Sequence, residues 1–419
     1  MDNERNHMNA WEKQESVTPC GCQTLSKMPC RHVNGVYPKF LTKGEGAYVW
    51  DDAGNKYIDF PLACGPILLG HNHYAVNDAV KRQLGFATSL SLPNPLESTV
   101  AQKIIDLIPS AESVRFVKTG SEATSAAVKI ARAFTGRNKI LCCGYHGWHD
   151  WYNCTTPKRK GVPDDMRKLC KQIKYNNLKG FEKHMNTLTA AVIIEPYVLE
   201  KPKDGFLEKL AEMCRDNGTL LIFDEVVTGL RTPHGSAQAF FSVMPDLTCM
   251  GKAMGNGLPI GAVCGRKDVM DVLKDDCFVS STFGGELLSL AAADAVLDFC
   301  KKNPVFDTIN ESGQTLKDSF NQECERLELD AKCIGYPNRT FFIFPTEEHK
   351  SLFWQECVKR GVLFGYAQFV SYSHTPDIIN ETCTVMRDAL DIVKSHWGSP
   401  KAALEGDCAG ATFRLVAAR

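Results

Sequence analysis

From about Ser98 onward, the chain alternates short apolar runs with longer segments that have the periodicity of helices. The short runs are Val114 to Val117, Ile140 to Cys143, Ala191 to Ile194, Leu220 to Phe223 and Leu247 to Met250. Runs of this length fit strands that are buried on both faces, and strands that are joined through helices pair in parallel. The pattern therefore predicts an α/β fold in which helices cover both faces of a mostly parallel sheet.

The ends of the chain predict a second, smaller α+β domain. Residues 46–60 alternate apolar and polar side chains around a turn, which predicts a β-hairpin. Near the other end, an apolar run at Thr340 to Phe344 precedes helical patterns near Glu348 to Arg360 and from about Thr375 to Trp397. Because 419 residues exceed the usual size of one core, we expect separate domains. The predicted parts are a polar tail (1–30), the N-terminal part of the small domain with a connecting segment (31–90), a large α/β domain (91–325) and the C-terminal part of the small domain (326–419).

The charge balance argues against a polyanionic partner. The chain has 48 Lys and Arg and 49 Asp and Glu, which gives a formal charge of -1, and the two signs are interspersed. We therefore expect a small neutral or zwitterionic ligand, with no nucleic acid and no membrane as partner. No apolar run is long enough to span a bilayer, and residues 1–15 lack the apolar core of a signal peptide, so the chain is predicted to be soluble and cytoplasmic.

The 18 cysteines are scattered rather than packed into a small disulfide framework, and we expect them to be reduced. Cys20, Cys22, Cys30 and His32 are close enough in sequence to suggest a zinc site. Their spacing matches no standard zinc pattern, so the preferred interpretation is a polar, aperiodic tail without a metal.

A glycine turn follows the first apolar run of the predicted sheet. Residues 118–123 read Lys-Thr-Gly-Ser-Glu-Ala, and a helical pattern extends from there to Gly136. Gly120 leaves backbone N–H groups accessible at a helix N-terminus and the Ser121 hydroxyl adds a donor, which together form a geometry that binds phosphate. The alternative is that Ser121 is an ordinary helix cap and binds no phosphate.

After the second run, Tyr145 and His146 stand between Gly144 and Gly147. An aromatic side chain that is flanked by glycines can lie flat against a heteroaromatic ring. His146, like His149 after it, suggests a metal site or a general base. No companion Glu or Cys completes a metal-binding spacing, so we expect both histidines to pack or to form hydrogen bonds.

Two side chains of opposite charge follow the last two runs. Asp224 comes directly after Leu220 to Phe223, while Lys252 follows Leu247 to Met250 and precedes a glycine-rich turn at Gly255 to Pro259. Open α/β sheets bind ligands beyond the carboxyl ends of their strands, so the two groups can serve one ligand from two sides. A structural ion pair is the alternative. An unprotonated amine that forms an imine and a carboxylate that keeps a ring nitrogen protonated are the groups that an electron-withdrawing cofactor ring requires.

With these segments in this order and spacing, the chain resembles the class III, fold-type I aminotransferases. The similarity runs from roughly Phe40 to His396 and includes Gly65 to His71, Phe223 to Arg231 and Thr282 to Gly285. Within the family, it is most similar to the glutamate-1-semialdehyde 2,1-aminomutase branch. The resemblance implies pyridoxal 5′-phosphate as cofactor, bound by the large domain. It also implies a mostly parallel seven-stranded sheet with helices on both faces and a small α+β domain built from the two chain ends.

The resemblance also implies roles for the residues around the cofactor ring. Lys252 forms the Schiff base and shuttles the proton, and Asp224 pairs with the pyridinium nitrogen. Val226 packs on one face of the ring and Tyr145 stacks on the other. Glu195 lies near the hydroxyl side of the cofactor.

For the phosphate, the resemblance implies binding by Gly120 and Ser121. Thr282 resembles the residue that reaches the phosphate of the neighbouring subunit. Because the family is dimeric with active sites at the interface, we expect a homodimer.

Four segments depart from the aminomutase pattern. Pro29 to Arg31 only loosely matches its carboxylate-binding arginine motif, and Cys64 replaces a pocket tryptophan. Gly285 to Leu287 replaces a Gly-Asn-Pro sequence, and the segment Gln368 to His374 is preceded by a shortened stretch. The cofactor chemistry is thus better supported than the substrate.

The leading hypothesis is a transaminase that moves an amino group between an amino donor and a carbonyl substrate, such as an unusual aldehyde or a keto sugar. The first alternative is the intramolecular aminomutase, and the second is a non-catalytic member of the fold that binds the cofactor or a protein. Retention of both Lys252 and Asp224 argues against the second. A nucleotide-binding dehydrogenase is disfavoured because no G-x-G-x-x-G turn follows the first sheet strand.

Overall fold

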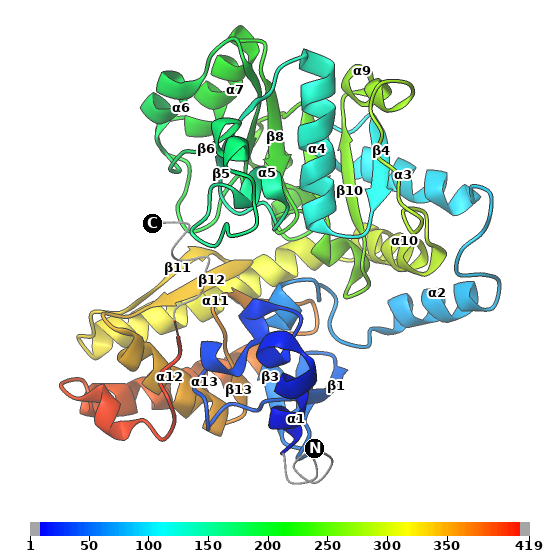
Figure 1. Cartoon of the computed structure of the whole chain (residues 1–419). Coiled ribbons are helices and arrows are strands. Elements are labelled where there is room, and N and C mark those ends of the chain that lie inside the picture. The colour runs from blue at the N-terminus through cyan, green and yellow to red at the C-terminus, as the bar shows by residue number, and fades with distance from the viewer. Residues whose placement is uncertain (1–8, 411–419) are drawn as a thin grey trace. The chain divides into compact units, whose positions relative to one another are not determined.

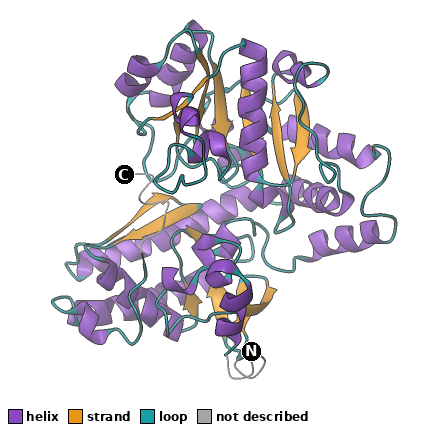
Figure 2. Cartoon of the chain, in the orientation of Figure 1, coloured by secondary structure: helices purple, strands orange, loops and turns teal. Residues whose placement is uncertain are grey.

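The computed structural model describes residues 9–410, whose contacts form two compact units (Figure 1). Unit 1 combines the residues up to Cys64 with those from Ser312 onward, and unit 2 extends from Gly65 to Glu311. Each unit contains both strands and helices (Figure 2). The predicted domain boundaries, which follow residues 30, 90 and 325, remain predictions about independently folding parts of the chain.

Unit 2 contains a seven-stranded sheet with the order β4-β10-β9-β8-β7-β5-β6. Its strands are β4 (Ser113–Val117), β5 (Lys139–Cys143), β6 (Cys170–Gln172), β7 (Thr189–Ile194), β8 (Leu220–Asp224), β9 (Leu247–Met250) and β10 (Gly261–Gly265). Strands β6, β5, β7, β8 and β9 pair in parallel, whereas β10 is antiparallel to β9 and to β4. All five apolar runs form strands, and the predicted α/β fold with a mostly parallel sheet of seven strands is confirmed.

Helices cover both faces of this sheet. Those that begin in unit 2 are α2 (Tyr74–Leu84), α3 (Pro95–Leu107), α4 (Gly120–Thr135), α5 (Asp150–Asn153), α6 (Leu178–His184), α7 (Phe206–Asp216), α8 (Ala237–Phe241), α9 (Lys267–Met270), α10 (Leu287–Lys302) and α11 (Val305–Arg326), which continues into unit 1. On one face, Ile193 and Ile222 pack in a buried cluster with the small side chains of α4. On the other face, Val192 and Leu221 pack with α6 and α7. Figure 1 shows α4 running along the sheet.

Unit 1 contains two smaller sheets. Its strands are β1 (Leu41–Glu45), β2 (Tyr48–Asp51), β3 (Lys56–Asp59) and β13 (Val362–Leu363) in the first sheet, and β11 (Lys332–Tyr336), β12 (Arg339–Ile343) and β14 (Gln368–Phe369) in the second. Strands β2 and β3 form the predicted hairpin, which a turn around the buried carboxylate of Asp51 closes. β13 pairs in parallel with β3, so one sheet joins segments from the two ends of the chain.

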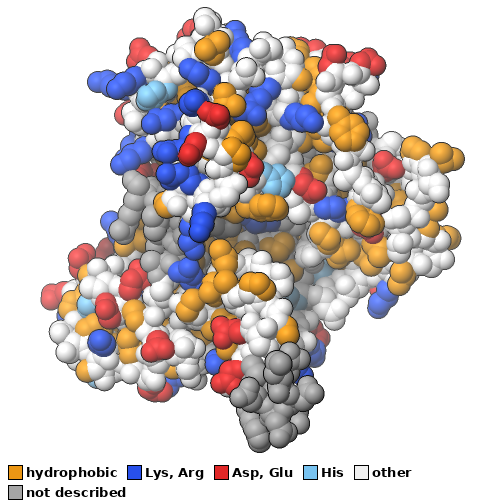
Figure 3. Space-filling view, viewed as in Figure 1, with side chains coloured by type: hydrophobic (Ala, Val, Ile, Leu, Met, Phe, Trp, Pro, Cys, Tyr) orange, Lys and Arg blue, Asp and Glu red, His pale blue; other side chains and the backbone are white. Residues whose placement is uncertain are grey.

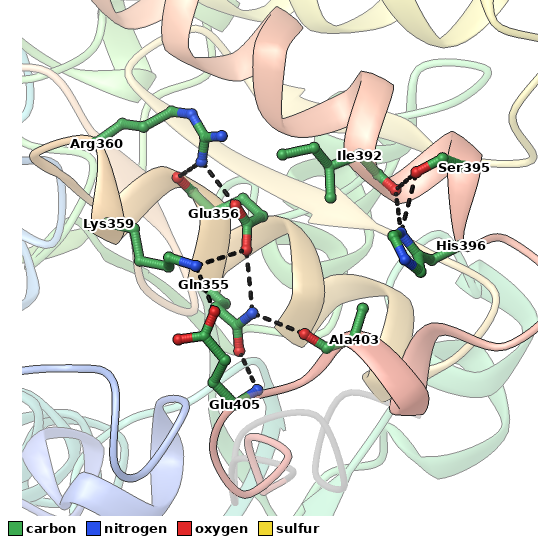
Figure 4. A network of polar contacts seen from close by, with 9 residues as sticks. All are labelled: Gln355, Glu356, Lys359, Arg360, Ile392, Ser395, His396, Ala403 and Glu405. Atoms are coloured by element: carbon green, nitrogen blue, oxygen red, sulfur yellow. Dashed lines mark hydrogen bonds and ion pairs between the residues drawn. The ribbon is translucent and has the colours of Figure 1, made fainter.

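Helix α12 (Glu347–Lys359) holds the segment near the carboxyl end through buried polar contacts (Figure 4). The amide of Gln355 donates to the carbonyl oxygen of Ala403 at 2.9 Å and accepts the N–H of Glu405 at 2.7 Å. On the same helix, Glu356 accepts from Arg360 at 2.7 Å. Because Gln355 is fully buried, these contacts satisfy an amide that is otherwise costly to bury. The second long helix of this part is α13 (Pro376–Ser395).

The predicted polar tail has more regular structure than its sequence indicated. Helix α1 (Ala10–Val17) begins with a capping box in which Asn9 and Glu12 exchange hydrogen bonds. Short 3₁₀ turns follow at Pro19–Gly21, Leu25–Lys27 and Pro29–Arg31. A capping box needs only two residues with the right spacing, so it forms without apolar periodicity.

The cysteines of the chain are free thiols, and most of them are buried. Cys20 and Cys30 are exposed, whereas His32 is half-buried and stacks on Tyr37 with 5.0 Å between ring centroids. Burial lowers the pKa of His32 to about 4. Among residues 9–410, no group of His, Cys, Asp and Glu side chains has the arrangement of a metal site. Within the same residues, no helix is long and apolar enough to cross a membrane.

Candidate functional site

The carboxyl ends of the parallel strands bring Asp224 and His146 together. Asp224 is the last residue of β8, and His146 lies in the loop after β5. Oδ2 of Asp224 is 2.7 Å from Nδ1 of His146, whose Nε2 is 3.1 Å from the carbonyl oxygen of Cys143. Both ring nitrogens of His146 therefore lie within hydrogen-bond distance of an oxygen. Since both side chains are buried, this pairing fixes the orientation of the Asp224 carboxyl group.

His146 is itself fixed by packing. Its ring stacks on Trp151 with 6.1 Å between centroids and meets the edge of Tyr152 at 5.4 Å. Its carbonyl oxygen accepts a hydrogen bond of 2.8 Å from Thr124 in α4. As predicted, His146 and His149 form hydrogen bonds, and His149 meets the Ser125 hydroxyl at 2.7 Å. No pattern in the sequence indicated that His146 contacts Asp224, because the two residues lie 78 positions apart.

Glu195 and Tyr145 meet at the same edge of the sheet. Glu195 follows β7 and is buried, and one of its oxygens accepts the backbone N–H of Tyr145 at 3.0 Å. Gly144 has a φ of +111°, and a side chain on it would meet the carboxylate stem of Glu195. The glycine thus permits the close approach that places Glu195 beneath the loop carrying Tyr145.

The N-terminus of α4 is capped by Thr119, so the alternative role of Ser121 as helix cap is wrong. The Thr119 hydroxyl accepts the N–H of Glu122 at 3.1 Å, and the Glu122 carboxylate accepts the N–H of Thr119 at 2.8 Å. Gly120 and Ser121 are then first-turn residues, whose N–H groups no helical carbonyl can reach. Gly147, with a φ of +98°, lies against Ser121 and leaves no room for a side chain.

Val226 packs against both the turn at Gly120 and the turn at Gly251. A Cβ placed on Gly120 would lie 2.6 Å from Cγ1 of Val226, and one placed on Gly251 would lie 3.4 Å from the same atom. The N–H of Val226 also donates to Asp224 at 3.1 Å. Val226 therefore touches the phosphate-binding candidate turn, the residue before Lys252 and the carboxylate.

We predict that Gly120→Ala weakens cofactor binding by about 10- to 100-fold, since overpacking of this kind costs about 1–3 kcal/mol. The added methyl group cannot coexist with Val226 in its present position. Titration of the apoprotein with cofactor, followed by absorbance, measures the change. Gly398→Ala is the control, because a Cβ there meets nothing within 4 Å. Equal affinities for the two variants would contradict the prediction.

Lys252 lies on a turn that is fastened to residues 65–70. It is partly buried, has a φ of +43° and begins the 3₁₀ turn Lys252–Gly255, which Asn256 ends. Oδ1 of Asn256 accepts the N–H groups of Leu68 and Leu69, each at 2.8 Å, and its amide donates to Gly70 at 3.1 Å. Because all these groups are buried, Asn256 fixes the lysine turn against the 65–70 segment.

Arg231 fastens the other end of the same segment. It is fully buried and donates to the carbonyl oxygens of Gly65 at 3.0 Å and Ile67 at 2.8 Å. Burial lowers the pKa of Arg231 to about 9. Because the Arg231 guanidinium donates to two backbone carbonyl oxygens, it holds in place the segment that contains Gly65 and Pro66.

We predict that Asn256→Ala lowers the free energy of unfolding by about 2–5 kcal/mol, because each unsatisfied buried polar group costs about 1–3 kcal/mol. The midpoint of denaturant-induced unfolding of the apoprotein measures the loss. Asn380→Ala, at an exposed position of α13, serves as the control and should shift the midpoint little. If Asn256→Ala and the control unfold at the same midpoint, the hydrogen bonds of Asn256 to residues 68–70 do not stabilise the fold.

Thr282 does not join the other candidates through any contact described for this chain. It is exposed in the loop before α10, near the exposed Phe278 and Phe283. Glu286, one of the departures from the aminomutase pattern, caps α10 by accepting the N–H of Leu288 at 2.7 Å and pairs with Lys118 at 3.0 Å. Burial opposes its ionisation, but hydrogen bonds and Lys118 outweigh burial and lower the pKa of the carboxyl.

Comparison with known proteins decides the family. A family model described as "Aminotransferase class-III" matches residues 31–330. The chain is a class III aminotransferase. The match spans the whole of unit 2, so the family assignment rests on the sheet and the loops that carry the candidate residues.

Relatives of this aminotransferase share most of its length. Glutamate-1-semialdehyde 2,1-aminomutase of Syntrophobacter fumaroxidans is 35% identical over 371 residues, which cover 81% of this chain and 86% of the relative. A 3-aminobutyryl-CoA aminotransferase of Cloacimonas acidaminovorans is 32% identical over 407 residues, covering 92% and 97%. Among solved structures, the PLP internal aldimine form of the FumI protein from Sphingopyxis sp. MTA144 has a TM-score of 0.86 and 28% identity, covering 93% and 96%. The enzyme class, the fold and pyridoxal phosphate as cofactor are therefore confirmed.

Proposed function

We propose that this class III aminotransferase transfers an amino group from an amino donor to a separate carbonyl acceptor. The observation that carries the proposal is the buried pairing of Asp224 with His146 at the carboxyl edge of the sheet, at 2.7 Å. A buried carboxylate whose orientation is fixed by a hydrogen bond is suited to hold a protonated ring nitrogen. Bound pyridoxal phosphate supplies an electron sink for the charge left when a Cα proton is removed.

The residues of this chain then divide the remaining tasks. Lys252 holds the cofactor covalently and, once released by the amino substrate, moves the proton between carbon atoms. Tyr145 and Val226 would flank the ring of the bound cofactor. Glu195, which accepts the N–H of Tyr145, would lie at the hydroxyl side of that ring.

The phosphate-binding role belongs to Gly120 and Ser121 at the start of α4. The cap by Thr119 supports this proposal, since it leaves both N–H groups outside the capping box. The contact between Gly147 and Ser121 brings the loop that carries Tyr145 to the same place. The residues present therefore fit the cofactor: Asp224 offers an acid for its ring nitrogen, the N–H groups of Gly120 and Ser121 are donors for its phosphate, and the glycines leave space beside them.

We also propose a homodimer in which Thr282 completes the phosphate site of the neighbouring subunit. The exposed Phe278 and Phe283 near it, and Phe86 and Leu92 in another loop, are 77%, 58%, 86% and 79% exposed, which favours a surface covered by a second copy. Mixing Lys252→Ala with Thr282→Val subunits tests the arrangement. If Thr282 acts across the interface, the mixture regains activity that neither variant has alone, and no regain contradicts it.

An experiment must distinguish amino transfer between two substrates from the intramolecular aminomutase reaction. The 35% identity to an aminomutase makes the second reaction the main alternative. The cofactor-loaded protein is incubated with single amino acids as donors, and keto-acid release is measured. A transaminase releases keto acid and leaves the cofactor in its amino form, whereas a mutase needs no external donor. Conversion of glutamate-1-semialdehyde without any donor would overturn the proposal.

The acceptor is proposed to be an aldehyde or ketone that forms part of a larger molecule. One relative is named a 3-aminobutyryl-CoA aminotransferase, and its 32% identity over 407 residues supports the proposal of a large substrate. A cytoplasmic location is also proposed. The free thiols among the described residues support it, since reduced cysteines are typical of that compartment.

A further inference from the structure

A strongly basic segment lies in unit 2 between α5 and the strand β7. Between residues 158 and 183 it has nine Lys and Arg side chains against three acidic ones, Asp164, Asp165 and Glu182. The cations are Lys158, Arg159, Lys160, Arg167, Lys168, Lys171, Lys174, Lys179 and Lys183, and all but the half-buried Arg159 are exposed. Figure 3 shows Lys and Arg gathered over the region of β6 and α6.

The acids of this segment cannot neutralise its charge. Lys168 pairs with Asp165 at 2.6 Å, which leaves two acidic side chains for the other cations. Because the whole chain has a formal charge of -1, the remainder is acidic, and the even overall balance conceals a local excess. Clustered charges of one sign produce a potential that attracts oppositely charged ligands over several ångströms.

The beginning of the basic segment is tied to the loop that holds Tyr145 and His146. Tyr152, six residues before Lys158, donates from its hydroxyl to the carbonyl oxygen of Gly144 at 3.0 Å and meets the ring of Tyr145 edge-on at 5.7 Å. The chain leaves this contact through α5 and enters the basic segment directly. Only the short helix α5 therefore separates Lys158, Arg159 and Lys160 from the loop that holds Tyr145 and His146.

The carboxyl end of β6 brings further cations to the edge of the sheet where Glu195 lies. β6 is parallel to β5, so Lys174 emerges at the edge occupied by the candidate residues. The neighbouring Tyr175 donates from its hydroxyl to Pro196, the residue after Glu195. Asn176 binds the carbonyl oxygen of Lys201 and the N–H of Lys203, each at 3.0 Å. Lys203 pairs with Glu200 at 3.3 Å, so this stretch adds the charge of Lys201 to the same edge.

We propose that the carbonyl acceptor of this enzyme bears a phosphate-containing handle, of the kind found in nucleotide-linked sugars and in CoA thioesters, and that the basic segment binds its phosphates. This inference rests on the proposed aminotransferase function and names the class of its acceptor. Arg and Lys form strong charge-assisted hydrogen bonds with phosphate oxygens, and a diphosphate offers many acceptors at once. A free amino acid or a small aldehyde has too little charge to need such a surface.

Nine of these cations lie within residues 158–183, which favours a small polyanion over a nucleic acid. Nucleic acids bind to basic stripes that follow many backbone phosphates. Here the remainder of the chain is acidic and would repel an extended anion. A handle of two or three phosphates matches the extent of the segment.

The test compares two triple charge reversals in the cofactor-loaded protein. The first variant combines Arg159→Glu, Lys160→Glu and Lys174→Glu. The matched control combines Lys81→Glu, Lys301→Glu and Lys302→Glu, which are exposed lysines on α2 and α10 with the same change in net charge. Calorimetry measures binding of uridine 5′-diphosphate, coenzyme A and phosphate-free uridine to both variants and to the unaltered protein.

We expect a diphosphate to bind the unaltered protein and the control equally, and to bind the first variant at least about tenfold more weakly, because its phosphates lose charge-assisted hydrogen bonds. Tighter binding of uridine diphosphate assigns a nucleotide-linked sugar, and tighter binding of coenzyme A assigns a thioester. Uridine should not bind. If the first variant does not fold, the unaltered protein still tests the proposal, because affinity for the phosphate compounds must then fall with rising salt.

Three results would overturn the proposal: affinities that do not change with charge reversal, binding no tighter than that of uridine, or tighter binding of single-stranded RNA than of either nucleotide. Keto-acid release from a small amino donor tests the aminotransferase function by itself, without the phosphate-binding proposal. The donor reaction should be equal in all three proteins, because the donor has no phosphate. Its absence from the unaltered protein would reject aminotransfer itself, whatever the nucleotides do.

Discussion

Replacing Lys252 with alanine is expected to lower amino transfer by at least about 10⁴-fold, the upper end of what proton transfer by one positioned side chain contributes. The variant loses both the covalent attachment of the cofactor and the proton shuttle. Borohydride treatment of the loaded enzyme should fix the cofactor on Lys252 of the unaltered protein, and peptide mass analysis should find no such adduct in the variant.

Lys301→Ala is the control for this experiment, because Lys301 is an exposed lysine in the last turn of α10. It should retain the adduct and the activity. Amino transfer at the native rate in Lys252→Ala, or an adduct on a different lysine, would remove Lys252 from the mechanism. The altered protein should fold normally, since Asn256 fastens the turn through three buried hydrogen bonds.

Asp224→Ala is expected to lower amino transfer by about 10²- to 10³-fold. Removing one preorganised group that stabilises charge in a transition state costs about 2.7–4 kcal/mol, and each 1.36 kcal/mol is a factor of ten in rate. The change removes the hydrogen-bond partner of His146 Nδ1 and the acceptor of the Val226 N–H. Single-turnover measurement of keto-acid release from a donor isolates this step from release of the second product.

Asp224→Asn and His146→Gln separate charge from orientation. The asparagine keeps the size of the side chain but not its charge, so it should be nearly as inactive as the alanine. The glutamine leaves the Asp224 carboxylate in place but weakens its positioning, so a smaller loss is expected. If Asp224→Asn works as well as the unaltered enzyme, a carboxylate is not needed at the ring nitrogen.

The main sheet could be predicted because its strands are short apolar runs that local sequence reveals. Two strands were not foreseen. β6 is three residues long and contains Lys171 and Gln172, since only one of its faces is fully covered at the edge of the sheet. β10 begins and ends with glycine, and its antiparallel direction depends on how the chain returns from the lysine turn.

The candidate site could be predicted as residue types, but not as a network. Asp224 and Lys252 stand at strand ends, which sequence reasoning can locate. The contact between Asp224 and His146 joins residues 78 positions apart, and that between Asn256 and Leu68 joins residues 188 apart. No local pattern encodes such distances. The cap by Thr119 was misjudged for a different reason, because threonine and serine are both good caps and stand two residues apart.

The local charge excess was missed because composition was averaged over the chain. Lys158 to Lys160 is visible in the sequence as a basic run, but its place beside the loop after β5 follows only from the contact of Tyr152 with Gly144. A run of charge becomes informative when its neighbours in space are known.

The burial of the thiols has a practical consequence for handling this enzyme. Only Cys20 and Cys30 are exposed, while twelve cysteines lie in the interior of the described chain. A thiol-alkylating reagent should therefore label few cysteines in the native protein and many in the unfolded protein. The number of labels per molecule would then count unfolding events directly, and a preparation that has once opened in air would tend to become cross-linked instead of refolding.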